Sequence, residues 1–359
     1  MLFSMRCTAS PSSAQSAPCV RPTTASQSTT AEARLSRRRL REGGEAGEGV
    51  EAELRAIENK SKTGKPGRQR YVRVTGDCRD CGVRRWVTRT EGKADMGTLV
   101  NYATDKGVAL LTLNDPPVNA YTHEMFKELD ANILEARFDD DVHVLVITGH
   151  GDKYFCAGAN INMLKEAGDT FKYYFCLHAN ETLLRLENTP KLTIAALNGH
   201  CVGGGFEVAL ACDLRIARAG AYQVGLPEVS LGVLPGTGGT QRLARLVGKA
   251  AAIELMIEGQ ALPVEDARGV GLVHKVWPAD SHDEFLRRVI AYAHEFCPPA
   301  RASAAVGSIK RAVQSGAEMS LEQGLSLERE LQQQLFRSQD AKEGLLAFTQ
   351  KRKAQFRGR

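Results

Sequence analysis

Two glycine clusters, each paired with a glutamate, constrain the chain most strongly between residues 198 and 242. The first is the run at 203–205, which Glu207 follows inside an apolar segment typical of a helix start. Glu228 comes 21 residues later, and glycines at 236, 238 and 239 follow it. Carboxylates are rarely buried unless they have partners or a task. Two glutamates, each beside its own glycine cluster, therefore favour a functional site over two carboxylates that only form structural ion pairs.

The glycine run also predicts backbone that can contact a ligand. Glycine has no Cβ, so another molecule can approach closely, and the first N–H groups of a helix favour developing negative charge. Residues 155–160, Phe-Cys-Ala-Gly-Ala-Asn, offer a second donor, because they join a strand-like run at 143–149 to a helical pattern. Two such donors would form an oxyanion hole. Two carboxylates sharing one small pocket push one of them to keep its proton, so one could activate water while the other delivers a proton.

Three segments together resemble the crotonase, or enoyl-CoA hydratase/isomerase, superfamily. They are FCAGANI at 155–161, NGHCVGGGFEVALACD at 198–213 and GLPEVSLGVLPGTGGTQRLARLVG at 225–248. The resemblance runs from about Gly97 to the C-terminus. It is strongest to the true hydratases, because both positions at which they carry a catalytic glutamate are Glu here.

The resemblance implies an α/β fold with a ββα spiral catalytic core of four turns over 96–290. A helical C-terminal region over 291–359 would then build a homotrimer, or a hexamer made of two trimers. The periodicity agrees with α/β, since apolar strand-like runs such as 108–113 and 142–148 alternate with helical patterns. Helical patterns fill most of the chain after Gly239, and no internal repeat is visible in the sequence.

The resemblance also assigns the site residues. The N–H groups of Ala159 and Gly204 would bind the thioester oxygen, Glu207 would activate water, and Glu228 would supply the proton for C2. The other implied residues orient the water or bind the substrate: Gly236, Gly203, Asn160, Ile161 and Lys351.

Two of these assignments have competing interpretations. The family pattern AGADIK has Asp and Lys where this chain has Asn160 and Asn162, so the coenzyme A contact of that lysine is missing. Lys165, one turn further on, could replace it. The resemblance lets Lys351 reach coenzyme A from a neighbouring subunit, but a solvated helix end is an equally good interpretation.

The implied activity is that of an enoyl-CoA hydratase. Such an enzyme adds water in syn geometry across the C2–C3 double bond of a trans-2-enoyl-CoA and gives the 3-hydroxyacyl-CoA, in fatty-acid β-oxidation or related acyl-CoA catabolism. Coenzyme A is then part of the substrate, and neither a metal nor another cofactor is implied. An enoyl-CoA isomerase is the alternative within the enzymes, although it usually keeps one carboxylate. An RNA-binding homologue is the alternative from a different class.

Charge and composition bear on these alternatives. The net charge of +5 comes from residues 1–95, with 19 basic and 11 acidic side chains, whereas 96–359 carry 28 and 31. An acidic body offers no broad platform for nucleic acid. No apolar run approaches the ~20 residues of a membrane helix, so no membrane span is expected. The spacing of Cys78 and Cys81 suits a metal, but a structural zinc site needs four ligands.

Residues 1–95 do not resemble a packed domain. They are rich in small and polar residues and carry the basic cluster SRRRLR at 36–41, so they bury too little apolar surface to fold. We expect translation to begin at Met96, and therefore a cytoplasmic protein. The alternative is a transit peptide, which would direct the protein to the mitochondrial matrix.

Overall fold

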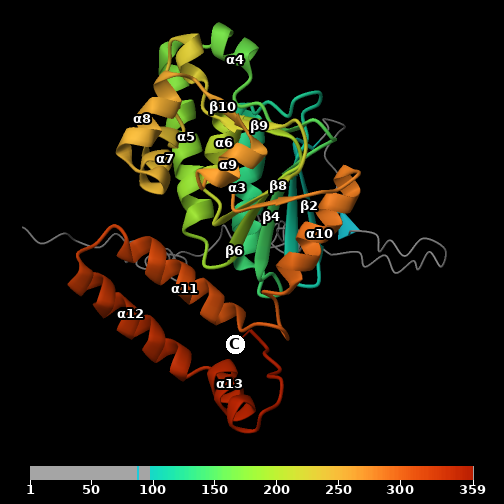
Figure 1. Ribbon diagram of the computed structural model, residues 1–359, viewed down its shortest axis with the longest axis vertical. Helices are drawn as coiled ribbons and strands as arrows, with labels where there is room; N and C mark the ends of the chain where they lie inside the picture. The colour runs from blue at the N-terminus through green and yellow to red at the C-terminus, as the bar shows by residue number, and fades with distance from the viewer. Residues whose placement is uncertain (1–86, 89–97, 359) are drawn as a thin grey trace, which may run out of the picture. The chain divides into compact units, whose positions relative to one another are not determined.

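The computed structural model describes residues 87–88 and 98–358, whose helices and strands are labelled in Figure 1. All but two residues of the predicted leader, 1–95, lie outside this described part, and so do Cys78 and Cys81. The two described residues of the leader form β1 (Val87–Thr88), which pairs in antiparallel fashion with β2 (Val100–Asp105). The domain boundaries after residues 95 and 290 stay predictions.

A seven-stranded sheet forms the centre of the fold, in the order β1-β2-β3-β4-β6-β8-β11. The strands from β3 onward run parallel, whereas β1, β2 and β3 pair in antiparallel fashion. Every residue of β4 and β6 is buried, because parallel sheets are covered on both faces. The remaining bounds are β3 (Val108–Leu113), β4 (Val144–Gly149), β6 (Leu192–Leu197), β8 (Leu214–Arg218) and β11 (Lys275–Trp277).

A second sheet of four short strands has the order β10-β9-β7-β5. Its bounds are β5 (Tyr154–Cys156), β7 (His200–Val202), β9 (Gln223–Gly225) and β10 (Ala261–Pro263). Along the chain, β5, β7 and β9 each follow one strand of the large sheet and precede a helical segment. With the first unit, β2–β3–α3, they make four successive ββα units, which confirms the spiral fold.

Helices cover both faces of the large sheet. On β4, Leu145 and Ile147 belong to the core under α3 and α5, whereas Val144 and Val146 face α10 (His282–His294). This alternation follows from the two-residue period of a strand. Helix α3 (His123–Phe138) begins at a side-chain cap, with Met125 N–H donating to the Thr122 hydroxyl at 3.3 Å. The other core segments are α4 (Ile161–Glu166), α5 (Asp169–Glu187), α6 (Gly204–Leu210), η1 (Glu228–Leu231), α7 (Gly239–Val247), α8 (Lys249–Ile257) and α9 (Val264–Gly269).

The C-terminal region is helical, as predicted. It consists of α11 (Ser303–Gly316), α12 (Leu321–Phe336) and α13 (Gln339–Thr349), drawn in orange-red to red in Figure 1. Helix α11 contacts β6 and α12, and α12 in turn contacts α13. Helices α11 and α12 leave large apolar side chains exposed, among them Ile309, Val313, Leu321 and Leu325.

Candidate active site

Glu207 lies in the first turn of α6 and is almost fully buried, with 1% of its surface exposed. Its Oε1 accepts the N–H groups of Thr237 at 2.8 Å and Gly239 at 2.6 Å. Its Oε2 accepts the Thr237 hydroxyl. Burial raises the pKa of Glu207, while these hydrogen bonds oppose that rise by stabilising the ionised form. The second glycine cluster therefore holds Glu207 in one orientation.

Glu228 has the opposite surroundings. It is the first residue of η1, and its Oε2 is buried with no hydrogen-bond partner among the described residues. Burial raises the pKa of Glu228 to about 7, and the nearby charge of Glu207 adds to the rise. A carboxyl with this pKa can both give and take a proton at neutral pH.

The two predicted donor segments meet beside these carboxylates. A Cβ added to Gly158 would lie 3.0 Å from the Gly204 N atom, and one added to Gly203 would lie 3.3 Å from Glu228 Oε1. Gly203 has a φ of 56° and Gly158 a φ of 94°, which favour glycine. The structure thus brings the glycine run, the loop at 155–160 and both glutamates to one place.

The Ala159 amide faces away from the chain that flanks it. Tyr121 N–H donates to Gly158 O at 2.9 Å, and Asn160 N–H donates to Tyr121 O at 2.9 Å. The bridge between Tyr121 and Ala159 therefore uses the groups on either side of Ala159. Since successive N–H groups of an extended chain point in opposite directions, the Ala159 N–H points away from Tyr121.

The other predicted residues lie in different settings. Gly236 is half-buried at the start of the loop that holds Glu207, and its carbonyl accepts the Asn180 side chain at 3.3 Å. Asn160 caps α4 by accepting Met163 N–H at 3.1 Å, and Ile161 is exposed. Lys351 is exposed just after α13, and the structure does not bring it to the glutamates. Its approach from a neighbouring subunit stays a prediction.

Sequence reasoning missed two residues next to Glu207. Thr237 supplies two of the three hydrogen bonds to that carboxylate. Cys176 on α5 packs against Gly236, where an added Cβ would lie 3.4 Å from its Sγ. Both lie far from Glu207 in sequence, so only their place in the fold reveals them. The one available signal was the position of Thr237 between glycines of the second cluster.

The described residues hold no group of three or more His, Cys, Asp or Glu side chains placed to bind a metal ion. None of the helices within residues 98–358 is long and apolar enough to cross a membrane.

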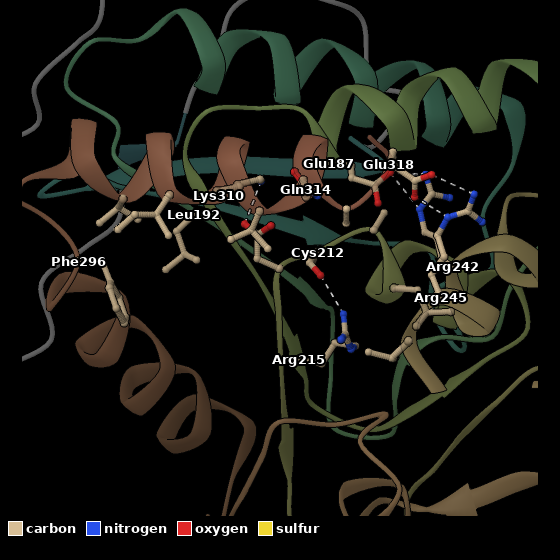
Figure 2. Close-up of a pocket in the computed structure, with 18 of the residues that line it drawn as sticks. Glu187, Leu192, Cys212, Arg215, Arg242, Arg245, Phe296, Lys310, Gln314 and Glu318 are labelled. Atoms are coloured by element: carbon tan, nitrogen blue, oxygen red, sulfur yellow. Dashed lines mark hydrogen bonds and ion pairs between the residues drawn. The ribbon is translucent and has the colours of Figure 1, made fainter. Parts of the chain in front are cut away.

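A pocket of about 920 Å³ lies between α11 and the part of the core around Asp213 and Arg242, and neither Glu207 nor Glu228 lines it (Figure 2). Three ion pairs span its lining: Lys310–Asp213 at 2.9 Å, Arg242–Glu187 at 2.9 Å and Arg245–Glu318 at 2.6 Å. The pairs Lys310–Asp213 and Arg245–Glu318 connect α11 and the residues just after it to the core. The pocket therefore lies where these two parts of the fold meet and contains neither glutamate of the acid–base pair.

The ββα spiral with two carboxylates beside glycine-rich loops defines an enzyme of the crotonase type, and comparison with known proteins supports this class. The family model for enoyl-CoA hydratase/isomerase matches residues 103–359. The chain belongs to the enoyl-CoA hydratase/isomerase family.

Individual relatives match over nearly their whole length. A short-chain-enoyl-CoA hydratase of Clostridium acetobutylicum is 38% identical over 247 residues, which cover 68% of this chain and 92% of that protein. A 2,3-dehydroadipyl-CoA hydratase of Escherichia coli is 37% identical over 257 residues, covering 70% and 96%. The crystal structure of an enoyl-CoA hydratase from Geobacillus kaustophilus superimposes with a TM-score of 0.71 at 42% identity, covering 77% of this chain and all of that one.

Proposed function

We propose that this chain is an enoyl-CoA hydratase, which adds water across the C2–C3 double bond of a trans-2-enoyl-CoA to give the 3-hydroxyacyl-CoA. The observation that carries the proposal is the contrast between its two glutamates. Glu207 is held by three hydrogen bonds, whereas Glu228 Oε2 is buried with no hydrogen-bond partner in the described part of the chain, and burial raises the pKa of Glu228 to about 7. Membership of the family supports an acyl-CoA substrate in fatty-acid or related acyl-CoA catabolism.

The thioester carbonyl oxygen would lie between the N–H groups of Ala159 and Gly204. As water attacks C3, the π electrons move toward the thioester and negative charge develops on that oxygen. Two backbone donors held in place stabilise this charge, and the loss of one such donor typically costs about 3 kcal/mol of transition-state stabilisation. The close approach of Gly158 to the Gly204 N atom supports this arrangement.

The glutamates would then divide the proton transfers. Ionised Glu207 takes a proton from the attacking water while the water oxygen forms its bond to C3. Protonated Glu228 gives its proton to C2, and the enolate electrons form the new C–H bond. The Gly236 N–H would orient the water, and Gly203, Asn160 and Ile161 would border the substrate.

The direct test is an absorbance assay of the purified protein with crotonyl-CoA, a longer 2-enoyl-CoA and a 3-enoyl-CoA. We expect absorbance of the conjugated double bond to fall with the first two substrates as water adds. A protein that converts only the 3-enoyl-CoA into the conjugated isomer would be an isomerase, and the hydratase proposal would be rejected.

We also propose a homotrimer, or a dimer of trimers, with Lys351 of one subunit reaching coenzyme A on the next. The exposed apolar residues of α11 and α12 support association, because monomers rarely expose large apolar patches. Light scattering at micromolar concentration should give three or six times the mass of one chain. A monomer of full activity would contradict both parts of this proposal.

A further inference from the structure

The Arg242 guanidinium lies between helix α5 and the loop that holds Glu207. On the α5 side, its Nη2 donates to Glu187 Oε2 at 2.9 Å and its Nε to the same oxygen at 3.3 Å (Figure 2). On the loop side, its Nη1 donates to Thr237 O at 3.3 Å. The side chain of Arg242 is only 11% exposed, so little water competes for these contacts. The guanidinium is therefore fixed from two elements at once.

The backbone of Arg242 holds the same loop. Its N–H donates to Gly238 O at 2.9 Å. Gly238 has a φ of 108°, and a Cβ at this position would collide with Arg242 Nη1. Glycine at 238 thus leaves the room in which the guanidinium reaches Thr237. Thr237 in turn donates its N–H, at 2.8 Å, and its hydroxyl to Glu207, so a single loop residue connects the cation to the carboxylate.

Ionisable side chains near Glu207 come from several elements. Tyr121, before α3, and Cys176, on α5, are neutral at pH 7, because burial raises the pKa of each. Glu228 of η1 is the acidic neighbour, and burial together with the charge of Glu207 raises its pKa to about 7. Arg242 of α7 supplies a positive charge, which opposes the rise that burial causes in the pKa of Glu207.

We propose that Arg242 is a positioning residue that determines which of the two glutamates carries the proton of the pair. Its guanidinium fastens the loop whose donors bind Glu207, and its positive charge favours ionisation of Glu207 over ionisation of Glu228. The proton then stays on Glu228, which is the arrangement that hydration requires. The kinetic part of this proposal rests on the hydratase function proposed above.

The size of the effect follows from the difference between two pKa values. A difference of one unit places the proton on the weaker acid in a ratio of about 10 to 1. An opposite charge beside a carboxyl typically lowers its pKa by about 1–3 units, and one loop residue between the two groups favours the lower end. Loss of the cation should therefore move a measurable part of the proton from Glu228 to Glu207.

The test removes the charge of each partner of the ion pair in turn. Arg242→Gln keeps an N–H donor and removes the cation, Arg242→Lys keeps the cation, and Glu187→Gln keeps the acceptor and removes the anion. Exposed Arg245→Gln, one turn further along α7, is the matched control. We expect Arg242→Gln to lower kcat/KM on crotonyl-CoA about tenfold at pH 7 and to move the acid limb up by about one pH unit. Arg242→Lys and the control should stay near the unaltered protein.

The two charge removals should act on Glu207 with different signs. Arg242→Gln raises the pH at which Glu207 titrates. Glu187→Gln removes a negative charge that offsets the guanidinium, so it does not raise this pH. An ion pair that is merely structural predicts instead that both variants lose activity in step with their unfolding free energy, while the titration stays in place. That result, or an unmoved acid limb in Arg242→Gln, would overturn the proposal.

The double variant Glu187→Gln/Arg242→Gln keeps the proposal testable if Arg242→Gln does not fold. It keeps the net charge of the chain and leaves no buried carboxylate without its cation. Arg242 is the partner that bonds to the loop, so the double variant should still raise the pH at which Glu207 titrates. An unmoved titration in this folded variant would count against Arg242 as strongly as in the single one.

A readout without substrate separates this proposal from the hydratase function. The infrared bands of the protonated carboxyls, assigned with Glu207→Gln and Glu228→Gln, report which glutamate holds the proton at neutral pH. We expect the band of Glu228 in the unaltered protein, and part of the intensity in the band of Glu207 in Arg242→Gln. If this shift occurs in a protein that does not hydrate crotonyl-CoA, Arg242 still places the proton and the hydratase function fails. Normal hydration with the proton on Glu228 in both proteins overturns the role of Arg242 alone.

Discussion

Glu207 and Glu228 are the same residue type in one pocket, and their surroundings give them different tasks. Three donors from the second glycine cluster hold Glu207 and support its ionised form. No donor among residues 98–358 reaches Glu228 Oε2, and burial raises the pKa of this carboxyl to about 7. A base and an acid result from two identical carboxyls.

Both glutamates should therefore be needed for hydration and neither for folding. Glu207→Gln and Glu228→Gln each keep the side-chain size but remove a titratable proton. We expect each to lose at least about 100-fold in kcat on crotonyl-CoA, the order of one general acid–base contribution. The double variant should lose much less than the product, because the pair acts as one unit.

Exposed Glu265→Gln on α9 is the control and should keep normal activity and stability. Near-normal hydration by Glu228→Gln beside an inactive Glu207→Gln would contradict the paired mechanism. A one-carboxylate enzyme would then be the better interpretation.

The pH dependence follows from the single proton that the pair shares. Hydration needs Glu207 ionised and Glu228 protonated, and the reverse dehydration needs the opposite arrangement. Both arrangements carry one proton, so the states with two protons or none are inactive in both directions. We expect a bell-shaped dependence of kcat/KM on pH, with the same two apparent pKa values for hydration and dehydration. The activity should fall above about pH 7, as the pair loses its one remaining proton.

Stability should change in the matching direction. Folding raises the pKa of Glu228 above its ordinary value, so the folded protein binds this proton more tightly than the unfolded chain. Its contribution favours folding at acid pH and is lost as the pH rises through about 7. Urea denaturation of Glu228→Gln at several pH values should lack this loss of stability.

For activity, a basic limb in only one reaction direction would contradict the shared-proton scheme.

Long elements were predictable from the sequence, and short ones were not. The 16 residues of α3 follow a threonine cap, and β4 and β6 are continuous apolar runs of six residues. Strands β5, β7 and β9 have three residues each, too few to show a two-residue period. The second sheet, and with it the repetition of the ββα unit, therefore had no sequence signal of its own.

The candidate site was predictable to a similar extent. Glycines beside Glu207 and Glu228 marked it, because close backbone approach requires them. The contacts of Tyr121 and Thr237 could not be read in this way, since a hydrogen bond between residues 207 and 237 depends on how α6 packs on the loop before α7. Whether the predicted oxyanion amides bind substrate stays a prediction.

The packing of α6 on β5 gives a test of one glycine in the first cluster. A Cβ on Gly205 would lie 2.2 Å from the Cys156 carbonyl oxygen, so Gly205→Ala must push α6 away from the strand that leads to Ala159. We expect a loss of unfolding free energy of about 1–3 kcal/mol, the usual effect of overpacking. Gly269→Ala, at a helical position with open space around it, is the control and should be neutral or stabilising. Urea denaturation of both variants decides, and equal stabilities would show that α6 does not pack as described.

An ion pair with little exposure to solvent joins the C-terminal helices to the spiral core. Lys310 on α11 has 6% of its side chain exposed and contacts Asp213, which has 15% exposed, at 2.9 Å. Asp213 also accepts Thr193 N–H at 2.7 Å and the Thr193 hydroxyl at 2.9 Å, so it is fixed from the β6 side as well. The pair therefore fixes α11 relative to two strands of the large sheet.

Substitution of Lys310 should consequently lower the free energy of unfolding more than substitution of an exposed lysine. Lys310→Met keeps much of the apolar stem but leaves Asp213 without its cation, and breaking a buried pair in this way typically costs about 3–5 kcal/mol. Lys310→Met/Asp213→Asn should cost less than the single change, because no buried charge is left without a partner. Exposed Lys342→Met on α13 should change stability by under about 0.5 kcal/mol. Urea denaturation followed by circular dichroism measures all three, and a Lys310→Met protein as stable as Lys342→Met would show that α11 is held to the core mainly by apolar contacts.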